Sequence, residues 1–167
     1  YVVQHYGQPE IDLDDYRLKV TGLVDEEREY TLEDLQNMSQ FDIDAGFECG
    51  GNNAGRFQGL VGNANWRGIR LRNILNASGV SSEGTEVVFF GADSGTEAIP
   101  NRDTEVEQSF ARSLPVAEAM REENILALEM NGEDLPQGHG RPLRLVVPGY
   151  YGVANVKWLT QIHIQDR

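Results

Sequence analysis

Residues 47–56 read FECGGNNAGR, and they contain the only cysteine of the chain, Cys49. One thiol cannot form an internal disulfide or a four-thiolate zinc site. It can be an inert buried thiol, a reactive nucleophile, or the single protein ligand of a metal carried by a cofactor. Gly50, Gly51 and Gly55 leave the backbone free to close around a bulky polar group. This stretch therefore indicates a candidate site whose chemistry is still open.

The composition of the whole chain narrows the classes of partner. The 167 residues suit a single domain over residues 1–167, and the hydrophobic and charged fractions of 40% and 25% are typical of a globular protein. The net charge of −13 repels the phosphates of nucleic acid and anionic membrane surfaces. No apolar run reaches the roughly 18 residues of a membrane span, and no signal peptide is visible. We therefore expect no nucleic-acid partner and no membrane span.

Hydrophobic periodicity predicts more strand than helix. Short helices are predicted from a cap at Thr31 to about residue 38, over residues 71–77 with a stop at Gly79, and over residues 115–121. Asn131-Gly132 is a hairpin turn signal. Strands are predicted at residues 16–22, 41–49, 86–91, 125–130, 143–147 and 161–165. The predicted fold class is α+β, with mixed β-sheets and short helices, and not a βαβ repeat.

A second unusual segment lies toward the C-terminus. Residues 138–144 read GHGRPLR and residues 148–158 read PGYYGVANVKW, which joins His139, Arg141, Arg144 and Lys157 to flexible glycines. In so acidic a chain, this local excess of cations suits an anionic group such as phosphate. Taken singly, His139 is more often a satisfied loop histidine.

Other common sites are not supported by the sequence. Trp66 and Trp158 are expected to be core anchors. There is no Walker motif, no G-x-G-x-x-G after a strand, no C-x-x-C-H and no H-E-x-x-H. A cysteine-protease pair of Cys49 and His139 lacks the sequence context of such enzymes.

Several motifs in order along the chain resemble one known family. They are CGGN at residues 49–52, WRGIRL at 66–71 followed by Ile74-Leu75, NGEDLP at 131–136, HGRPLR at 139–144 and VKWL at 156–159. Together they resemble the sulfite oxidase family of molybdopterin enzymes, from about residue 1 to the end of the chain.

The resemblance implies a molybdopterin-binding fold rich in β structure. It implies a molybdopterin cofactor whose molybdenum is held by a pterin dithiolene, oxo groups and Cys49, and a soft thiolate suits such a metal. The residues that it assigns to cofactor binding are Gln4, His5, Gly51, Asn52, Asp93, His139, Arg144, Asn155, Val156 and Lys157.

Some positions depart from the family pattern around the substrate. Val3, Asn53 and Ala54 stand where family members have arginines, and Phe110 stands where they have a tyrosine. A small anion needs convergent cations. The resemblance leaves Arg56, taken as a catalytic residue beside Cys49, or Arg102 to compensate.

The expected activity is oxygen-atom transfer at molybdenum with a two-electron exchange. The overall likeness to sulfite oxidases favours a small oxo-anion such as sulfite as the substrate. The absence of the family's pocket arginines favours a sulfoxide-type compound or another oxo-substrate, which the enzyme would reduce. No haem or dimerisation domain is recognised in this chain, so electrons are expected to pass to a separate electron-transfer protein or subunit. By analogy with exported bacterial relatives the location is periplasmic or extracytoplasmic, and a cytoplasmic location is the alternative. A non-catalytic module that kept the fold and lost the metal is the alternative from another class.

Overall fold

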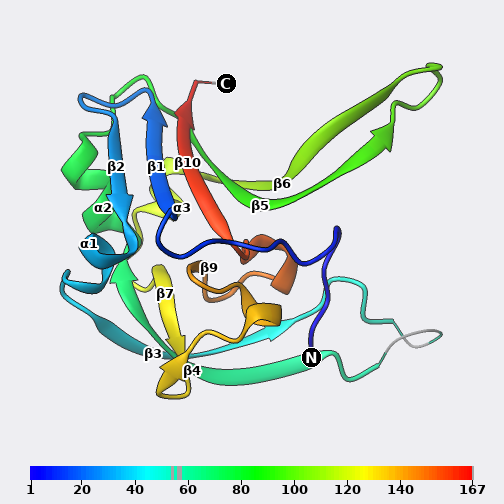
Figure 1. Cartoon of the computed structure of the whole chain (residues 1–167), viewed down its shortest axis with the longest axis horizontal. Helices are drawn as coiled ribbons and strands as arrows, with labels where there is room; N and C mark the ends of the chain where they lie inside the picture. Colours follow the sequence, from blue (N-terminus) through cyan, green and yellow to red (C-terminus); the bar gives the residue numbers. More distant parts are fainter. Residues whose placement is uncertain (54, 56–57, 167) are drawn as a thin grey trace.

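The strands of the computed structural model form two sheets, and the model describes residues 1–53, 55 and 58–166 (Figure 1). The first sheet has the order β2-β1-β10-β5-β6, and in it β1 and β10 are parallel. Its strands are β1 (Arg17–Gly22), β2 (Arg28–Thr31), β5 (Glu86–Ala98), β6 (Glu105–Pro115) and β10 (Leu159–Gln165). The mixed sheets and short helices confirm the predicted α+β class.

The second sheet is antiparallel and has the order β3-β4-β7-β8, with β9 also paired to β7. Its strands are β3 (Phe41–Glu48), β4 (Val61–Arg70), β7 (Ile125–Met130), β8 (Glu133–Asp134) and β9 (Arg144–Val146). The helices are α1 (Leu32–Gln36), α2 (Leu71–Ser78), α3 (Val116–Ala119) and the 3-10 turns η1 (Gln137–His139) and η2 (Gly152–Ala154). No helix of the described residues is long and apolar enough to cross a membrane.

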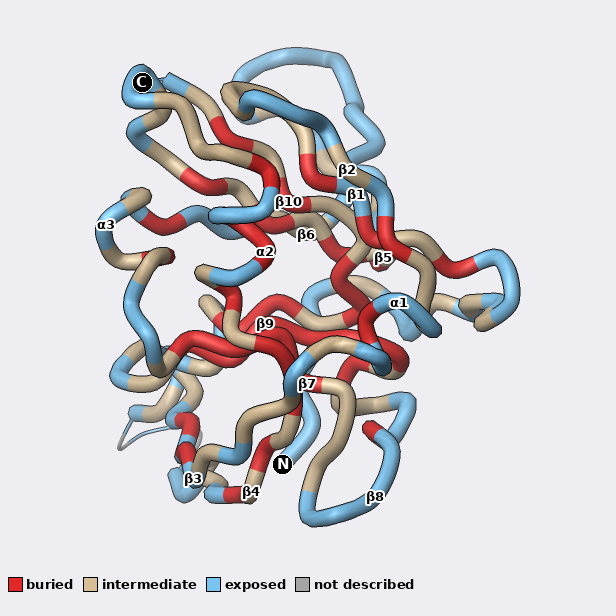
Figure 2. Tube along the Cα trace, turned by 90° about the vertical axis from the view of Figure 1, so that its left-hand side faces the viewer, coloured by how far each residue is buried: buried red, intermediate tan, exposed pale blue. Residues whose placement is uncertain are grey.

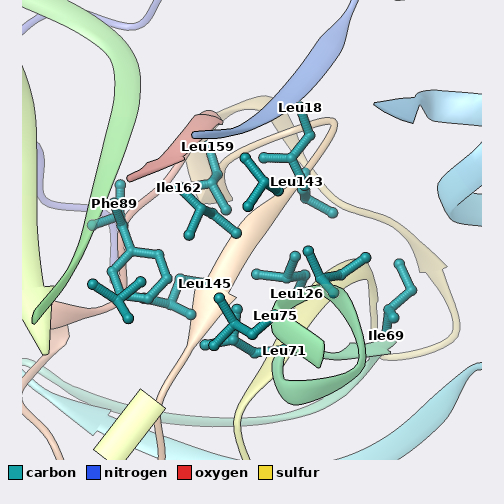
Figure 3. Close-up of a cluster of buried hydrophobic side chains, with 14 of the residues drawn as sticks. Leu18, Ile69, Leu71, Leu75, Phe89, Leu126, Leu143, Leu145, Leu159 and Ile162 are labelled. Carbon is teal, nitrogen blue, oxygen red and sulfur yellow. The ribbon is translucent and has the colours of Figure 1, made fainter. Parts of the chain in front are cut away.

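A large hydrophobic cluster joins the two sheets and α2 (Figure 3). Its fully buried members include Leu18, Phe89 and Ile162 from the first sheet, Leu126 from the second, and Leu75 from α2. Each buried side chain of this size contributes about 1.5–3 kcal/mol relative to an exposed one. Figure 2 shows the buried stretches of β7, β9 and β10 gathered toward the middle of the molecule. This core holds the two sheets together and so fixes the elements that carry the site.

A second, smaller cluster lies on the other face of the second sheet. Side chains alternate along β7, so Leu126 faces the large cluster while Ile125 and Ala127 face the small one. The small cluster also contains Phe47 and Trp66, whose rings are stacked 5.3 Å apart. These two rings form part of the cavity described below.

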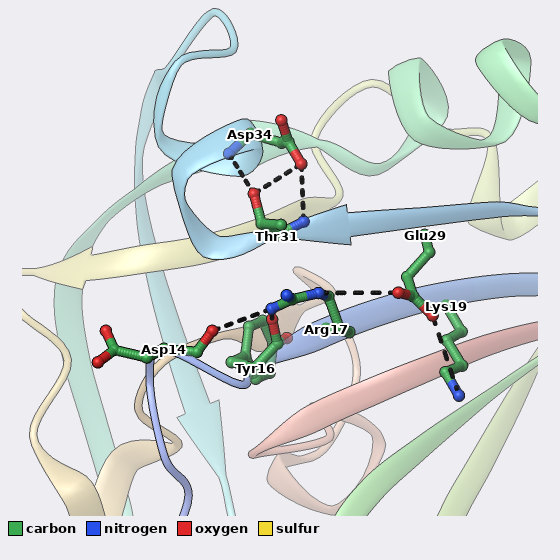
Figure 4. A network of polar contacts seen from close by, with 7 residues as sticks. All are labelled: Asp14, Tyr16, Arg17, Lys19, Glu29, Thr31 and Asp34. Atoms are coloured by element: carbon green, nitrogen blue, oxygen red, sulfur yellow. Dashed lines mark hydrogen bonds and ion pairs between the residues drawn. The ribbon is translucent and has the colours of Figure 1, made fainter.

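The local signals of the sequence are confirmed where they rest on short-range chemistry. Thr31 and Asp34 form a reciprocal capping box at the start of α1, with distances of 3.0 and 2.8 Å (Figure 4). Gly79 ends α2 in a left-handed conformation, and Asn131-Gly132 turns the chain between β7 and β8. The same view shows Glu29 paired with Arg17 and Lys19, but such exposed pairs contribute little to stability.

The structure differs from the predicted elements in several places. β5 continues past residue 91 to Ala98 and pairs with β6 in a hairpin that projects from the body (Figure 1). Its outer part is polar and largely exposed, so it carries no apolar alternation for a sequence pattern to detect. β2, β4, β6 and β8 were not predicted; the first half of β4 contains one Gly and two Asn residues, which disfavour strands. Helix α3 is shorter than predicted and begins after Pro115, which is the last residue of β6.

Candidate cofactor and substrate cavity

A cavity of about 560 Å³ lies where the ends of both sheets meet the N-terminal segment. Cys49 enters it from the loop after β3, Asp93 from β5, Phe110 from β6 and Arg144 from β9. Residues 152–158 and the loop at residues 138–139 complete the wall. The two segments that the sequence singled out therefore face one another across this cavity.

Cys49 lies at the end of β3 with its thiol partly buried. Its backbone N–H donates to Leu60 O at 2.9 Å, and the Gly51 N–H points at Sγ from 3.4 Å. Asn52 holds this loop by accepting from Leu60 N–H and donating to Leu60 O, so its side chain braces the loop and does not line the cavity.

Arg144 is a buried cation without an acidic partner. Its side chain is 4% exposed and donates to the carbonyls of His139 and Asn155, each at 3.1 Å. The guanidinium lies 5.1 Å from the Phe47 ring and 4.8 Å from the Trp66 ring. Burial lowers the pKa of Arg144 to about 9. A buried charge is costly unless it is paired, and no described carboxylate pairs with it.

Lys157 and His139 add to this positive region. The Lys157 ammonium donates to Gly138 O at 3.0 Å and lies 4.2 Å from the Trp158 ring. Burial, and then the charge of Arg144, lower the pKa of Lys157 to about 8. The same two causes lower the pKa of His139. The charge of Arg144 thus lowers the pKa of both neighbours, and positive charge gathered in one cavity favours binding of an anion there.

Gly140 permits the close packing behind these cations. Its φ is +110°, and a Cβ there would lie 3.0 Å from Lys157 Cβ and 3.1 Å from Arg144 Cβ. Only glycine combines that backbone conformation with so close an approach. The glycine after His139 is therefore a packing requirement of the site.

Trp158 holds an unusual backbone conformation beside Lys157. Its φ is +50°, which is rare for a bulky residue. Complete burial and a 2.9 Å hydrogen bond from its Nε1 to Gln137 O keep it there. Such conformations cluster at functional sites, where surrounding packing over-determines them.

Asp93 enters the cavity from a bulge in β5. The ladder with β6 pairs Phe90 with Ala111 and then Ser94 with Ser109, so residues 91–93 bulge opposite Phe110. Bulges re-aim side chains, and here both Asp93 and Phe110 line the cavity. A Cβ at Gly91 would lie 2.8 Å from Lys157 O, so the bulge also requires a glycine.

The carboxylate of Asp93 is an unsatisfied acceptor. The residue is 4% exposed, and its Oδ1 has no hydrogen-bond partner among the described residues. Burial raises its pKa. A buried acceptor without a partner destabilises the protein unless a ligand supplies a donor.

The N-terminal segment forms one wall of the cavity. Gln4 and His5 line it, and His5 Nε2 lies 2.7 Å from Glu97 Oε1 on β5. The Tyr6 hydroxyl donates to the same oxygen at 2.7 Å. Further along, Gln137 Nε2 donates to Pro9 O at 2.6 Å. The segment is thus attached at two points, and Figure 1 shows it crossing between the two sheets in dark blue.

The structure brings together most of the residues that the family resemblance assigned to the site. Those that line the cavity are Gln4, His5, Cys49, Gly51, Asp93, His139, Arg144, Asn155 and Lys157. Asn52 is a loop brace, and Val156 lies in the large hydrophobic cluster with its carbonyl accepting from Leu145 N–H. Arg56 and Ala54 lie outside the described residues.

Asn155 touches the cavity but uses its amide elsewhere. Its Oδ1 accepts from Val147 N–H at 2.6 Å and its Nδ2 donates to Tyr151 O at 3.0 Å. Its carbonyl accepts from Arg144. Asn155 therefore positions Arg144 and does not offer a free polar group to a ligand.

Several cavity residues had no predicted role in the site, among them Trp66, Trp158 and Arg112. Trp66 and Trp158 are buried as expected of core anchors, yet both also line the cavity. Arg112 lines it as well, whereas Arg102 does not. The signal for Arg112 was its spacing of two from Phe110, which places both on one face of a strand.

The donor set suits a metal that arrives with its own ligands. No group of three or more His, Cys, Asp or Glu side chains that could hold a metal ion occurs among residues 1–53, 55 and 58–166. Cys49 is a single soft ligand, the cations face the same cavity without acidic partners, and Asp93 offers an empty acceptor. These features fit a large anionic cofactor with N–H donors and a thiolate-binding metal.

Comparisons with known proteins identify the family of the chain. The profile of a family described as "Oxidoreductase molybdopterin binding domain" matches residues 5–167. The mitochondrial sulfite oxidase of Drosophila melanogaster is 36% identical over an alignment of 182 positions. This alignment covers 100% of this chain and 30% of that protein. The NADH nitrate reductase of Ulva prolifera is 29% identical over 183 residues, covering 100% of this chain and 21% of that protein.

A solved structure shows the same fold. The sulfane dehydrogenase SoxCD from Paracoccus pantotrophus matches with a TM-score of 0.80 and 33% identity, over 96% of this chain and 41% of that chain. The present chain therefore spans less than half the length of each of these relatives.

Proposed function

The chain belongs to the sulfite oxidase family of molybdopterin-binding oxidoreductases, and on that premise we propose that it binds a molybdenum cofactor and oxidises a small sulfur oxo-anion of the sulfite type. The observation that carries the proposal is the positive charge in the cavity. Arg144, Lys157 and His139 face the same space as Cys49, and no described carboxylate pairs with them.

Each residue has a distinct part in holding the cofactor. Cys49 would bind the metal through Sγ, and a thiol that coordinates a metal is deprotonated by it. Arg144 and Lys157 neutralise the anionic portion, and Asp93 accepts from its N–H groups. When bound, the cofactor supplies oxygen-atom transfer coupled to a two-electron change of its metal.

The remaining residues shape the space around the reacting atoms. Trp66 and Phe47 wall the cavity with apolar rings, which exclude water and strengthen the electrostatic interactions inside. Asn155 holds Arg144 in place. The protein thus supplies binding, orientation and electrostatics, while the redox chemistry belongs to the cofactor.

Electrons leave to a separate protein or subunit in this proposal. Among residues 1–53, 55 and 58–166, no group of three or more His, Cys, Asp or Glu side chains could hold a further metal ion. The nitrate reductase and SoxCD names describe larger proteins that this chain matches in part.

Reduction of a neutral sulfoxide-type substrate is the second candidate. It is favoured by the apolar side chains of Val2, Val3, Phe110 and Val153, which line the cavity. An apolar entrance suits an uncharged substrate.

Molybdenum content and turnover test the proposal together. Protein made in a host that synthesises molybdopterin should contain near-stoichiometric molybdenum by mass spectrometry and should reduce ferricyanide when sulfite is added. Cys49→Ser should abolish this turnover. It should leave the circular dichroism spectrum unchanged, because the partly buried thiol contributes little to the packing of the core. Wild-type protein from a host without molybdopterin synthesis is the matched control.

The same preparation separates the alternatives. Oxidation of reduced viologen by dimethyl sulfoxide, without sulfite activity, would favour the reductase. Full sulfite activity in Cys49→Ser would refute the role of the thiolate. Absence of molybdenum from the wild-type protein would favour a binding module that has lost the metal.

A further inference from the structure

Arg112 is an arginine of the cavity wall that has no acidic partner. Most arginines that the structure describes form ion pairs with Asp or Glu, whereas Arg102, Arg112 and Arg144 form none with a described residue. Arg144 is buried, and Arg102 lies at the hairpin tip away from the cavity. Arg112 alone among these three is both exposed and in the cavity lining. In a chain with 27 acidic and 14 basic residues, an arginine left free at a cavity is unexpected.

The guanidinium of Arg112 is oriented by its own strand. Residues 110 and 112 of β6 share one face, and the Arg112 guanidinium lies 4.3 Å from the Phe110 ring centroid. One nitrogen, Nη1, donates to Ala111 O at 2.6 Å. A guanidinium stacked on an aromatic ring keeps its remaining N–H groups at its edge, in the forked geometry that matches an oxo-anion.

The His5 side chain also lies near the Phe110 ring. The His5 and Phe110 ring centroids are 6.1 Å apart, and Glu97 holds His5 Nε2 at 2.7 Å. Both His5 and Arg112 are exposed members of the lining, whereas Arg144 is a buried one. The exposed end of the cavity thus carries a cationic group and an imidazole around one aromatic ring.

We propose that Arg112 recognises the negative charge of the substrate at the exposed end of the cavity, with His5 as a second polar contact. The proposal rests on the proposed function and deepens it, because it selects an oxo-anion over a neutral sulfoxide as the substrate class. Phe110 orients Arg112 through the contact of its ring with the guanidinium, and Glu97 orients His5. Arg112 thereby supplies a cation to a cavity whose entrance is otherwise lined by Val2, Val3 and Val153.

Arg112→Gln tests this role, and Arg102→Gln is the matched control with the same loss of charge on the same hairpin. Both side chains are exposed, so both variants should keep the wild-type melting temperature. In cofactor-loaded protein, Arg112→Gln should raise KM for sulfite by roughly tenfold or more and change kcat much less. Arg112→Lys should recover part of the loss, because it restores the charge without the fork.

A second readout does not depend on turnover. Sulfate, a redox-inert oxo-anion, is titrated calorimetrically at constant ionic strength into the wild type and both glutamine variants. The expected result is a roughly tenfold weaker sulfate affinity in Arg112→Gln alone. Equal affinities in all three proteins, or equal losses in both variants, would overturn the proposal.

The two proposals fail in different ways. A wild-type protein without molybdenum would contradict the proposed function, yet its sulfate titration would still decide the role of Arg112. A loaded, active enzyme whose KM for sulfite is unchanged in Arg112→Gln would refute the role of Arg112 and leave the proposed function standing.

Discussion

Replacing Gly140 by alanine tests how the cationic wall of the cavity is packed. The residue has φ +110°, and a new Cβ would meet Lys157 Cβ at 3.0 Å and both Arg144 Cβ and Lys157 Cα at 3.1 Å. These distances are shorter than ordinary carbon contacts of about 3.5–4.0 Å. The substitution therefore combines backbone strain with overpacking against the two residues that carry the positive charge.

The expected loss of stability is the sum of these two effects. A side chain in a left-handed conformation costs roughly 1–2 kcal/mol. Overpacking in a well-filled region typically adds about 1–3 kcal/mol. Gly149 and Gly132 have φ values of +88° and +81°, but a Cβ at either would have nothing within 4 Å. Alanine at residue 149 or 132 should therefore lose only the stability that corresponds to backbone strain.

Urea unfolding of cofactor-free protein measures the difference directly. Gly140→Ala should lose about 1–3 kcal/mol more than Gly149→Ala or Gly132→Ala. Gly140→Ala should also retain less molybdenum than the controls when made in a competent host, because Arg144 and Lys157 must shift. Equal losses in the three variants would refute the claim that close packing, and not backbone conformation alone, requires glycine at residue 140.

Three further perturbations follow from the contacts described above. Thr31→Ala removes the acceptor for the Asp34 N–H and should lower the free energy of unfolding by about 1 kcal/mol without changing molybdenum content; an unchanged urea midpoint would contradict the capping role. Lys157 has a pKa of about 8 in the folded protein and 10.5 as its ordinary value, so the unfolded chain binds more protons between these values and stability rises with pH there. Lys157→Met should therefore stabilise cofactor-free protein at pH 7, and the gain should shrink toward pH 10.5; a gain independent of pH would refute burial of the charge as its cause. Burial raises the pKa of Asp93, so its charged form weakens the fold as pH rises through that pKa, and Asp93→Asn should stabilise cofactor-free protein at pH 7 more than at pH 4 by thermal unfolding. A larger gain at pH 4 would contradict that sign.

Local chemistry made parts of the fold predictable. The α1 capping box, the Gly79 stop and the Asn131-Gly132 turn each depend on residues a few positions apart, and all are present. The outer part of the β5–β6 hairpin was not predictable from apolar alternation. Its strands pair only with each other and face water, so no buried face imposes a pattern on the sequence.

The sequence by itself determined the components of the site: one cysteine, a cluster of cations near the C-terminus, and ordered motifs that resemble one family. It did not determine which of the assigned residues reach a ligand. The side-chain amides of Asn155 and Asn52 form hydrogen bonds with backbone groups, and Val156 packs in the core. These roles could not be predicted, because they depend on partners distant in the chain or on packing.

Only the tertiary structure decided the charge balance of the cavity. Whether a cation forms an ion pair depends on which carboxylates lie within a few ångströms of it. In a chain this acidic, most of the described arginines have such a partner. Packing of the two sheets buries Arg144 away from every described carboxylate and leaves Arg112 exposed beside Phe110. The bulge in β5 aims Asp93 into the same space without a partner. These unmet interactions arise from folding, since they are set by distances in space that the order of residues does not contain.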